Sequence, residues 1–275
     1  MSVITLISDI GLQDYLVGAI KGRLMQWCPG YALVDIAHDI APFNAPQAAY
    51  LCKGAYPHFP EGTFHIILVN LFDSRTDEFL LAWHDGHYFC CADNGLLTMI
   101  IGGKPELLIR LRTAPGQPVN TMQVIHLFAQ AISSLSRGIA IDKLGEVSDA
   151  LVEKNSLQPL ISEDWMEGQI IYIDHFENVV VNITRQQFEQ QRKGRDFRIF
   201  VKRDEYISHI SSTYADVPEG NRLALFNTAG YLEIAINKGN AAGLFGLQSY
   251  HKEQAGLGGY NQSRLFYQTI RIHFG

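Results

Sequence analysis

Cysteine is scarce in this sequence, and the few cysteines follow no pattern of a metal site or a disulfide framework. The 275 residues include four, at positions 28, 52, 90 and 91. Their spacing is irregular, no Cys-x-x-Cys pair occurs, and adjacency disfavours a disulfide between Cys90 and Cys91. We therefore expect buried thiols in a reducing compartment.

An excess of positive charge and long apolar runs are also missing. The formal net charge is -6, which argues against a sequence-independent nucleic-acid binder, because such a protein needs a basic face. The start, Met-Ser-Val-Ile-Thr-Leu-Ile-Ser-Asp, lacks the basic beginning and long apolar core of a signal peptide, and no apolar run reaches the roughly 18 residues of a membrane span. We expect a cytoplasmic protein with no nucleic-acid or membrane partner.

The first half of the chain alternates between strand-like and helix-like segments. Apolar runs at 3–8, 31–36 and 63–70 are typical of strands, and the segments 15–27 and 46–55 between them have helical patterns. This order predicts an α/β domain with a mostly parallel sheet and right-handed crossovers. A further helix is expected over 121–137.

Polar residues follow the three apolar strands, and a ligand of a parallel sheet lies beyond the carboxyl ends of its strands. These ends carry Asp9, His38, Asp39 and Asn70. The first loop has a single glycine, so it is no G-x-G-x-x-G fingerprint, and we exclude a nicotinamide cofactor. Asp9 also fits a simpler role as the cap of the following helix.

A hairpin is predicted where an Asp-Gly pair separates the apolar runs 79–83 and 88–91. His84 and His87 flank this turn. No carboxylate or thiol pattern accompanies them, so we interpret both as exposed turn residues and predict no metal site.

The second half consists of short strands, which predicts an all-β domain, a small barrel or a sandwich. Residues 150–165 mix charges, Pro159 and acidic turns, so the predicted domains are 1–160 and 166–275. A helix-like segment, 186–192, interrupts the expected strands, which are 168–173, 178–183, 197–202, 222–227, 231–236 and 268–274.

The stretch 173–183 carries the most suggestive side chains of this half. If Asp174, Phe176 and Asn178 leave a strand at alternate positions, one face presents an acid, a ring and an amide, which suits a flat, cationic ligand. The alternative is a strand that turns a corner, with Asp174 and Asn178 capping backbone groups. A second dense stretch, 227–242, is either a plain hairpin or a place where small residues let a ligand approach the backbone.

Five segments in one order resemble the motifs of a known family. Thr5-Leu-Ile-Ser-Asp-Ile-Gly is similar to its Thr-Leu-x-Thr-Asp-Phe-Gly, and Ala92-Asp-Asn-Gly-Leu-Leu-Thr to its Pro-Asp-Asn-Gly-Leu-Leu-Thr. Val34-Asp-Ile-Ala-His, residues 173–183 and residues 227–242 also match. Together they resemble the S-adenosylmethionine hydroxide adenosyltransferases, which are relatives of the adenosylmethionine fluorinases and chlorinases.

The resemblance implies a seven-stranded Rossmann-like domain followed by a β-barrel, in a homotrimer that binds S-adenosylmethionine between neighbouring subunits. Water or hydroxide would attack the 5′ carbon of the ribose and release methionine and adenosine, with no cofactor beyond this substrate. Because a sulfonium is an excellent leaving group, the enzyme's tasks are alignment, desolvation and generation of a nucleophile.

Roles of single residues follow from the same resemblance. In the first domain, Asp9 would hold the ribose hydroxyls and Phe43 would line the pocket. In the second domain, Asp174 would face the methionine ammonium, Phe176 would pack on the ligand and Asn178 would meet the adenine edge. Asn227 and Thr228 would lie near the methionine end, and the backbone from Asn240 to Ala242 would contact the adenine.

The sequence departs from the family at the residues that activate water. Asn70 stands at the position of the family's aspartate and Gln123 at that of its histidine, and an amide orients water but cannot take its proton. Asp73, Arg75 and His126 are possible replacements, although Asp73 and Arg75 also fit a solvated pair and His126 a partly buried helix residue. The two resulting hypotheses are an S-adenosylmethionine hydrolase and a catalytically degenerate binder of S-adenosylmethionine or adenosine.

Overall fold

The computed structural model describes the chain except for residues 1, 75–76, 114–118, 203 and 248–267. The chain divides into two compact units, residues 1–156 and 157–275. Each unit has its own sheet and its own buried core.

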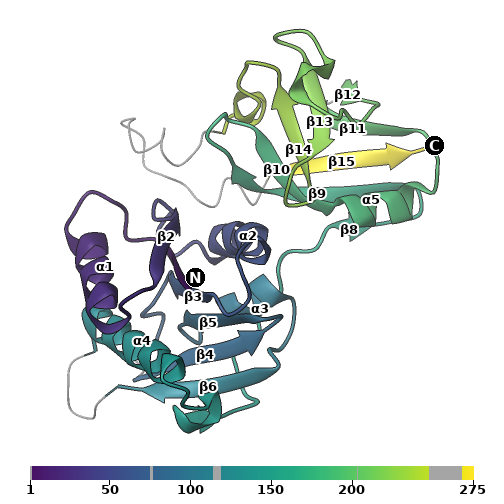
Figure 1. Ribbon diagram of the computed structural model, residues 1–275. Coiled ribbons are helices and arrows are strands. Elements are labelled where there is room, and N and C mark those ends of the chain that lie inside the picture. The colour runs from purple at the N-terminus through teal and green to yellow at the C-terminus, as the bar shows by residue number, and fades with distance from the viewer. Residues whose placement is uncertain (1, 75–76, 114–118, 203, 248–267) are drawn as a thin grey trace. The chain divides into compact units, whose positions relative to one another are not determined.

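The first unit is built on a seven-stranded sheet with the order β2-β1-β3-β5-β4-β6-β7 (Figure 1). β1 pairs in parallel with β2 and β3, and β3 pairs in parallel with β5, whereas β4 and β7 run antiparallel to their neighbours. The predicted Rossmann-like α/β domain with a mostly parallel sheet is confirmed. The strands are β1 Val3–Ser8, β2 Ala32–Ala37, β3 Phe64–Leu68, β4 Glu78–His84, β5 His87–Cys91, β6 Leu107–Arg112 and β7 Glu146–Val147.

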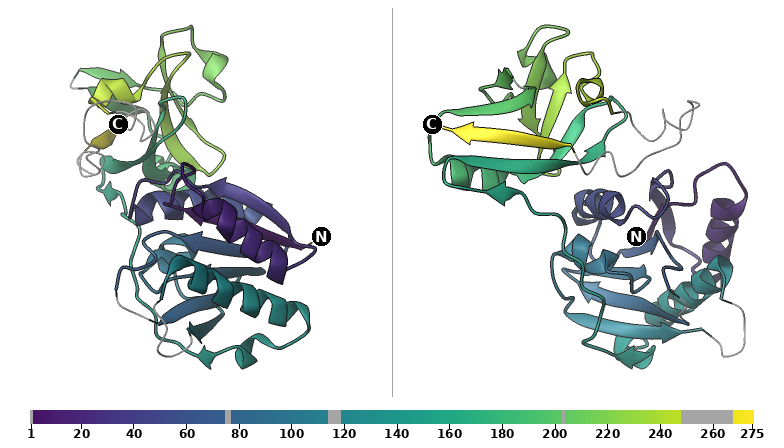
Figure 2. Two further views of the ribbon diagram at one scale, coloured as in Figure 1. Left: turned by 90° about the vertical axis from the view of Figure 1, so that its left-hand side faces the viewer. Right: turned by 180° about the vertical axis from the view of Figure 1, so that it is seen from behind.

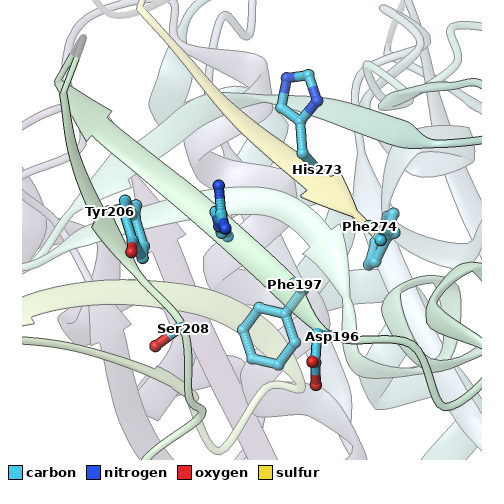
Figure 3. Close-up of a pocket in the computed structure, with 8 residues that line it drawn as sticks. Asp196, Phe197, Tyr206, Ser208, His273 and Phe274 are labelled. Atoms are coloured by element: carbon cyan, nitrogen blue, oxygen red, sulfur yellow. The ribbon is translucent and has the colours of Figure 1, made fainter.

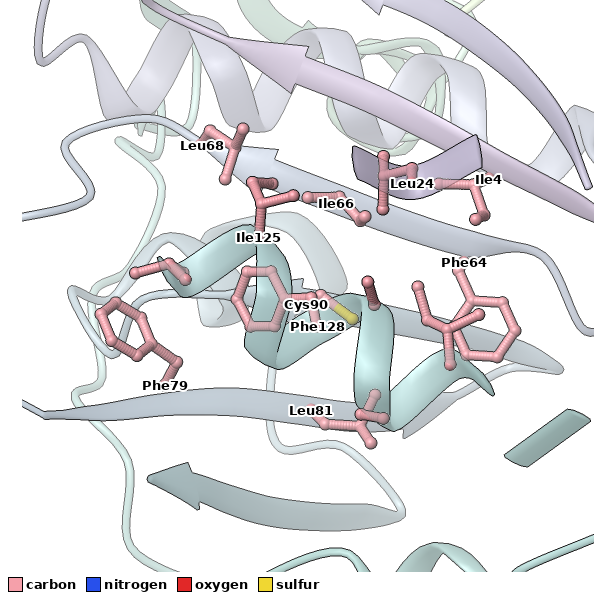
Figure 4. Close-up of a cluster of buried hydrophobic side chains, with 14 of the residues drawn as sticks. Ile4, Leu24, Phe64, Ile66, Leu68, Phe79, Leu81, Cys90, Ile125 and Phe128 are labelled. Atoms are coloured by element: carbon pink, nitrogen blue, oxygen red, sulfur yellow. The ribbon is translucent and has the colours of Figure 1, made fainter. Parts of the chain in front are cut away.

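Helices cover both faces of this sheet. On one face, α1 (Leu16–Trp27) and α4 (Thr121–Ser136) pack on strand residues such as Ile4 and Ile66 (Figure 4). On the other face lie α2 (Ala45–Ala55), α3 (Leu96–Ile101) and the short helix η1 (Tyr56–His58). Each large side chain buried in these layers contributes about 1.5–3 kcal/mol. A second short helix, η2 (Ile141–Lys143), precedes β7.

The interpretation of both hairpin histidines as exposed turn residues is wrong for His87. His87 is the first residue of β5, is 5% exposed, and lies with its Nδ1 3.2 Å from Nε2 of His65. On its other side, Nδ1 of His65 lies 2.7 Å from the hydroxyl of Thr5. The hairpin therefore buries a polar row that crosses β1, β3 and β5.

The second unit is an antiparallel sheet that curls into a nearly closed barrel (Figure 2), which confirms the predicted all-β domain. The strand path is β12-β11-β15-β9-β10-β14-β13, its end strands β12 and β13 contact each other, and β8 pairs with β9. The strands are β8 Leu160–Ile161, β9 Trp165–Ile173, β10 Val179–Thr184, β11 Phe197–Lys202, β12 Glu205–Ile207, β13 Arg222–Phe226, β14 Tyr231–Ile236 and β15 Thr269–Phe274.

One helix, α5 (Arg185–Arg192), covers the core of the barrel. Thr184 and Gln187 form a capping box at the start of α5. The side chain of each accepts a hydrogen bond from the backbone amide of the other. Phe188 is fully buried against Phe197 and Phe226. The short helices η3 (Tyr214–Asp216) and η4 (Ala242–Phe245) lie in the connecting loops.

The cysteines are free and buried, as predicted. Burial raises the pKa of Cys28 to about 11 and that of Cys91 to about 12, so these thiols stay protonated and unreactive at neutral pH. Within the described ranges, no helix combines the length and the apolarity that a membrane crossing requires.

Candidate functional site

Asp9 joins the loops that follow three neighbouring strands. It lies directly after β1, and its Oδ2 accepts hydrogen bonds from the amide of Phe43, 2.9 Å away, and from the amide of Asn70, 3.1 Å away. Phe43 belongs to the segment after β2, and Asn70 follows β3. The role of Asp9 as a helix cap is wrong, because the amide of Leu16 at the start of α1 donates to Asp14 instead.

The two amides that donate hydrogen bonds to Asp9 belong to residues in a left-handed backbone conformation. Phe43 has φ 64° and Asn70 has φ 48°, and such a conformation is uncommon outside glycine. Asn94 supports the second loop, because its side-chain amide donates to the carbonyls of Val69 and Asn70 at 3.1 and 3.0 Å. Sequence reasoning gave Asn94 no role of its own, although it stands in the Asp-Asn-Gly motif.

A cavity of about 160 Å³ opens beside Asp9. Phe43 and Phe72 at its wall are exposed by 70% and 47%, so two aromatic rings face the space next to a carboxylate. Such a wall suits a flat, hydroxyl-bearing ligand. The lining residues are Asp9, Ile10, Phe43, Leu68, Asn70, Leu71, Phe72 and Thr121.

The sequence candidates for water activation do not all meet at this cavity. Asn70 lines it, and its side-chain amide donates to Oδ1 of Asp73 at 2.9 Å. Gln123 lies in the first turn of α4, where its backbone amide donates to Asn120, and His126 packs its ring edge-on against Trp27 with centroids 4.6 Å apart. Neither is among the residues that line the cavity, and Arg75 lies outside the described residues.

A polar chain that runs from the buried Ser8 and His38 to the surface underlies the Asp9 loop. The Ser8 hydroxyl lies 2.7 Å from Nδ1 of His38, and Nε2 of His38 lies 3.0 Å from Oδ1 of Asp35, which also binds Lys21. Burial raises the pKa of Asp35, but hydrogen bonds from Lys21 and His38 outweigh burial, so the pKa is lowered overall. The chain fixes the residue that precedes Asp9.

In the second unit, Asp174, Phe176 and Asn178 occupy a turn between β9 and β10. The expectation that they leave a strand at alternate positions is wrong. Oδ1 of Asp174 accepts from the amides of Phe176 and Asn178 at 2.9 and 2.8 Å, and Oδ2 accepts from the side chain of Asn178 at 3.0 Å. These bonds pull the chain into a corner, as in the capping alternative, and leave Phe176 73% exposed.

The stretch 227–242 folds against this turn. The buried amide of Ala242 donates to the carbonyl of Glu177 at 2.9 Å, which joins the two stretches that the sequence singled out. Asn227 accepts from the amides of Ala229 and Tyr231, both at 3.1 Å. Asn240 accepts from the amide of Gly243 at 2.7 Å, and Thr228 is exposed.

Sequence reasoning missed Glu233, a buried carboxyl in β14 near the turn. It is 3% exposed, and the hydroxyl of Tyr214 donates to its Oε1 at 2.7 Å. Burial raises its pKa, and the charge of Asp174 raises it further. The signal in the sequence was a lone acid inside the apolar alternation Tyr-Leu-Glu-Ile-Ala-Ile.

Models of one protein family match both units of the chain. Residues 4–145 match the SAM hydroxide adenosyltransferase N-terminal domain, and residues 168–253 match its C-terminal domain. The chain belongs to the SAM hydroxide adenosyltransferase family. The family assignment confirms the resemblance of the sequence motifs.

Curated members and relatives of the SAM hydroxide adenosyltransferase family are similar to this chain over most of their length. An (R)-S-adenosyl-L-methionine hydrolase of Thermus thermophilus is 29% identical over 261 residues, which are 90% of this chain and 97% of the relative. A fluorinase of Nocardia brasiliensis is 26% identical over 93% of this chain and 97% of its own length.

Solved structures share the fold. An uncharacterized conserved protein from Thermotoga maritima aligns with a TM-score of 0.80 at 22% identity, over 98% of this chain and 99% of that one. A conserved hypothetical protein from Thermus thermophilus aligns with a TM-score of 0.70 at 24% identity, over the full length of both chains.

A larger cavity in this family member contains none of the predicted site residues. It measures about 590 Å³ and lies over β11, β12 and β15, where His273 and Tyr206 are among its walls (Figure 3). Both side chains are exposed, so this is an open surface hollow. Among the residues that the structure describes, no group of three or more histidine, cysteine or acidic side chains is placed to hold a metal ion.

Proposed function

We propose that the protein is an S-adenosylmethionine hydrolase, which converts S-adenosylmethionine and water into adenosine and methionine. The observation that carries the proposal is the convergence of three strand-end loops on Asp9, in a chain whose two halves both match the family. Relatives that span most of the chain bear the name of this hydrolase.

In this proposal, the first unit binds the ribose. Oδ2 of Asp9 is taken by two backbone amides, so Oδ1 is the oxygen that accepts from a ribose hydroxyl. Phe43 packs on the ligand from the wall of the cavity. A bidentate role for Asp9 would require these loops to move.

The second unit binds the two ends of the ligand. A carboxylate offers about four lone-pair sites, and three of those on Asp174 are used within its turn, so one remains for the methionine ammonium. Phe176 packs on the ligand and Asn178 meets the adenine edge. Asn227 and Thr228 lie near the methionine end, and the backbone from Asn240 to Ala242 faces the adenine; the Ala242 amide is already bonded, so Asn240 makes the direct contact.

The reaction needs a water held in line with the bond between sulfur and the 5′ carbon. Asn70 donates its amide hydrogen to Asp73, so its side-chain oxygen is left to accept from that water. As the new C–O bond forms, methionine leaves as a neutral thioether and the water proton passes to Asp73 and then to solvent. Alignment and exclusion of bulk water supply most of the acceleration.

The second candidate is a binder without activity, because the amides of Asn70 and Gln123 cannot accept a proton. One experiment separates the two candidates. Purified protein is incubated with S-adenosylmethionine, the release of adenosine and methionine is followed chromatographically, and binding is measured by calorimetry. Release above the uncatalysed rate supports the hydrolase, binding without release supports the binder, and the absence of binding overturns both.

We further propose a cytoplasmic homotrimer whose sites combine the first unit of one subunit with the second unit of its neighbour. The support is that ligand-type side chains are divided between the two units, with Asp9 and Phe43 in one and Asp174 and Phe176 in the other. Co-expression of a variant damaged in the first unit with a variant damaged in the second unit tests the oligomeric state and its contribution to activity.

A further inference from the structure

Glu233 is a buried acid in a strand that is otherwise apolar. Its neighbours Leu232, Ile234 and Ala235 are fully buried, and Glu233 itself is 3% exposed. A buried carboxylate is costly unless an opposite charge or several hydrogen bonds compensate it. Among the described residues, no lysine, arginine or histidine forms an ion pair with Glu233.

The polar groups that act on Glu233, among the described residues, are neutral or negative. Tyr214 of η3 donates its hydroxyl to Oε1 at 2.7 Å, and the side chain of Asn227 also forms a hydrogen bond with the carboxyl. On the strands at either side, the residues opposite Glu233 are Val180 of β10 and Leu225 of β13, both apolar. Among the described residues, the charged group that acts on Glu233 is Asp174.

Two carboxyl groups thus act on one another at this end of the barrel, and within the described part of the chain no basic side chain pairs with Glu233. Burial and then the charge of Asp174 raise the pKa of Glu233, and the hydrogen bonds from Tyr214 and Asn227 oppose this rise. Tyr172, on β9, is subject to the same charge, because burial and then Asp174 raise its pKa as well. A cationic ligand bound beside this cluster would favour the ionised form of its carboxyl groups.

We propose that Glu233 is a positioning residue that releases a proton when a cationic amino-acid ligand binds beside Asp174. The inference rests on the proposed function, because it takes S-adenosylmethionine, with its ammonium and sulfonium, as that ligand. The ligand's positive charge favours the ionised carboxylate, and the proton goes to solvent. The ionised carboxylate then accepts more strongly from Asn227, which holds the loop of Asn227 and Thr228 at the methionine end.

This role of Glu233 distinguishes a cationic ligand from a neutral one. Adenosine carries neither the ammonium nor the sulfonium, so it gains nothing from the ionised Glu233. By linkage, the affinity for a cationic ligand rises as the pH increases through the pKa of Glu233 in the ligand-free protein, which lies above the ordinary 4.5. The affinity for adenosine stays flat over the same range.

The test is calorimetric titration of the full chain with sinefungin, a cationic analogue with an amine in place of the sulfonium, so that no turnover occurs. Titrations in two buffers of different ionisation enthalpy, from about pH 5 to about pH 8, give the number of protons released. We expect release with sinefungin and none with adenosine. Glu233→Gln should bind sinefungin more weakly, by about tenfold for each unit of pKa shift that the ligand causes in the native protein, and release no proton.

Three further variants keep the test independent of folding defects. Tyr214→Phe removes one donor to the ionised carboxylate, so the rise in affinity should move to higher pH, whereas Tyr206→Phe, at an exposed tyrosine of the same unit, should leave it in place. Glu219→Gln removes an exposed carboxylate that pairs with Lys238 and should release protons as the native protein does.

Equal proton release by the native protein and Glu233→Gln would overturn the inference, as would no release by the native protein. Adenosine release from S-adenosylmethionine, measured separately, tests the proposed function alone. If turnover is present and proton release is absent, only the role of Glu233 falls. If neither sinefungin nor S-adenosylmethionine binds, both fall together.

Discussion

At the scale of single residues, the carboxylate of Asp9 has a structural task and, in the proposed function, a binding task. One oxygen holds the backbone of Phe43 and Asn70, which adopt unfavourable left-handed conformations. The other oxygen is the one that we propose to accept a hydrogen bond from a ligand hydroxyl. A substitution at Asp9 therefore changes the shape of the cavity and its chemistry together.

We expect Asp9→Ala to lose most of its affinity for S-adenosylmethionine. Its free energy of unfolding should fall by about 1–3 kcal/mol, because two hydrogen bonds, one exposed and one partly buried, are lost. Asp9→Asn keeps an acceptor oxygen, so its stability should fall less. Calorimetric binding and urea unfolding measure the two effects. Asp14→Ala, which removes an exposed cap of α1, is the matched control and should retain binding; equal loss in both variants would contradict the role of Asp9.

Asp73 and His126 should respond differently to substitution. If Asp73 receives the water proton, Asp73→Asn lowers kcat by about 100-fold or more and leaves KM nearly unchanged. His126→Phe should leave kcat unchanged, because its ring packs on Trp27 and a phenyl ring can do the same. Steady-state rates of adenosine release decide the matter, and a large loss in His126→Phe would place that histidine at the reaction after all.

At the scale of elements, the strands and helices followed from apolar periodicity, because burial of one face dictates the pattern. The turn 174–178 did not follow from periodicity but from turn chemistry, as in the capping alternative, because the hydrogen bonds of Asp174 to its own loop override the alternation of a strand. His87 was misplaced for a related reason. Its burial depends on a partner, His65, that is far away in the sequence and adjacent only in the sheet.

The row of Thr5, His65 and His87 makes the first unit sensitive to acid. Burial, and then the neighbouring His87, lower the pKa of His65 to about 3, and burial lowers that of His87. Below the ordinary histidine pKa of 6.5, the unfolded chain binds protons that the folded sheet does not bind. The contribution of these histidines to stability is therefore complete above pH 6.5 and is lost as the pH falls from 6.5 towards 3.

Between pH 7 and pH 5 we expect His65 to lower the free energy of unfolding by about 2 kcal/mol. Urea unfolding of the native protein at the two pH values, followed by tryptophan fluorescence, measures the change. His65→Gln keeps polar atoms near Thr5 and His87 and should lose less stability on acidification. His209→Gln, at an exposed histidine, serves as the control, and an identical acid sensitivity in all three proteins would refute the assignment to His65.

At the scale of the whole molecule, the site residues fall into two groups that belong to separate units. Asp9, with the cavity beside it, belongs to residues 1–156, and the turn of Asp174 with the stretch 227–242 belongs to residues 157–275. If a complete site combines groups from neighbouring subunits, a subunit damaged in one unit still supplies the intact other half to its neighbour.

Co-expression of Asp9→Ala and Asp174→Ala chains, carrying different affinity tags, tests this arrangement. Each variant alone should be inactive, whereas in a cyclic trimer that contains both chains about one interface in three joins an intact first unit to an intact second unit. Adenosine release by the doubly purified trimers should therefore recover to about a third of the native rate. If each site were formed within one chain, every chain would carry one defect and no mixture would regain activity, so the absence of recovery in verified mixed oligomers would refute shared sites.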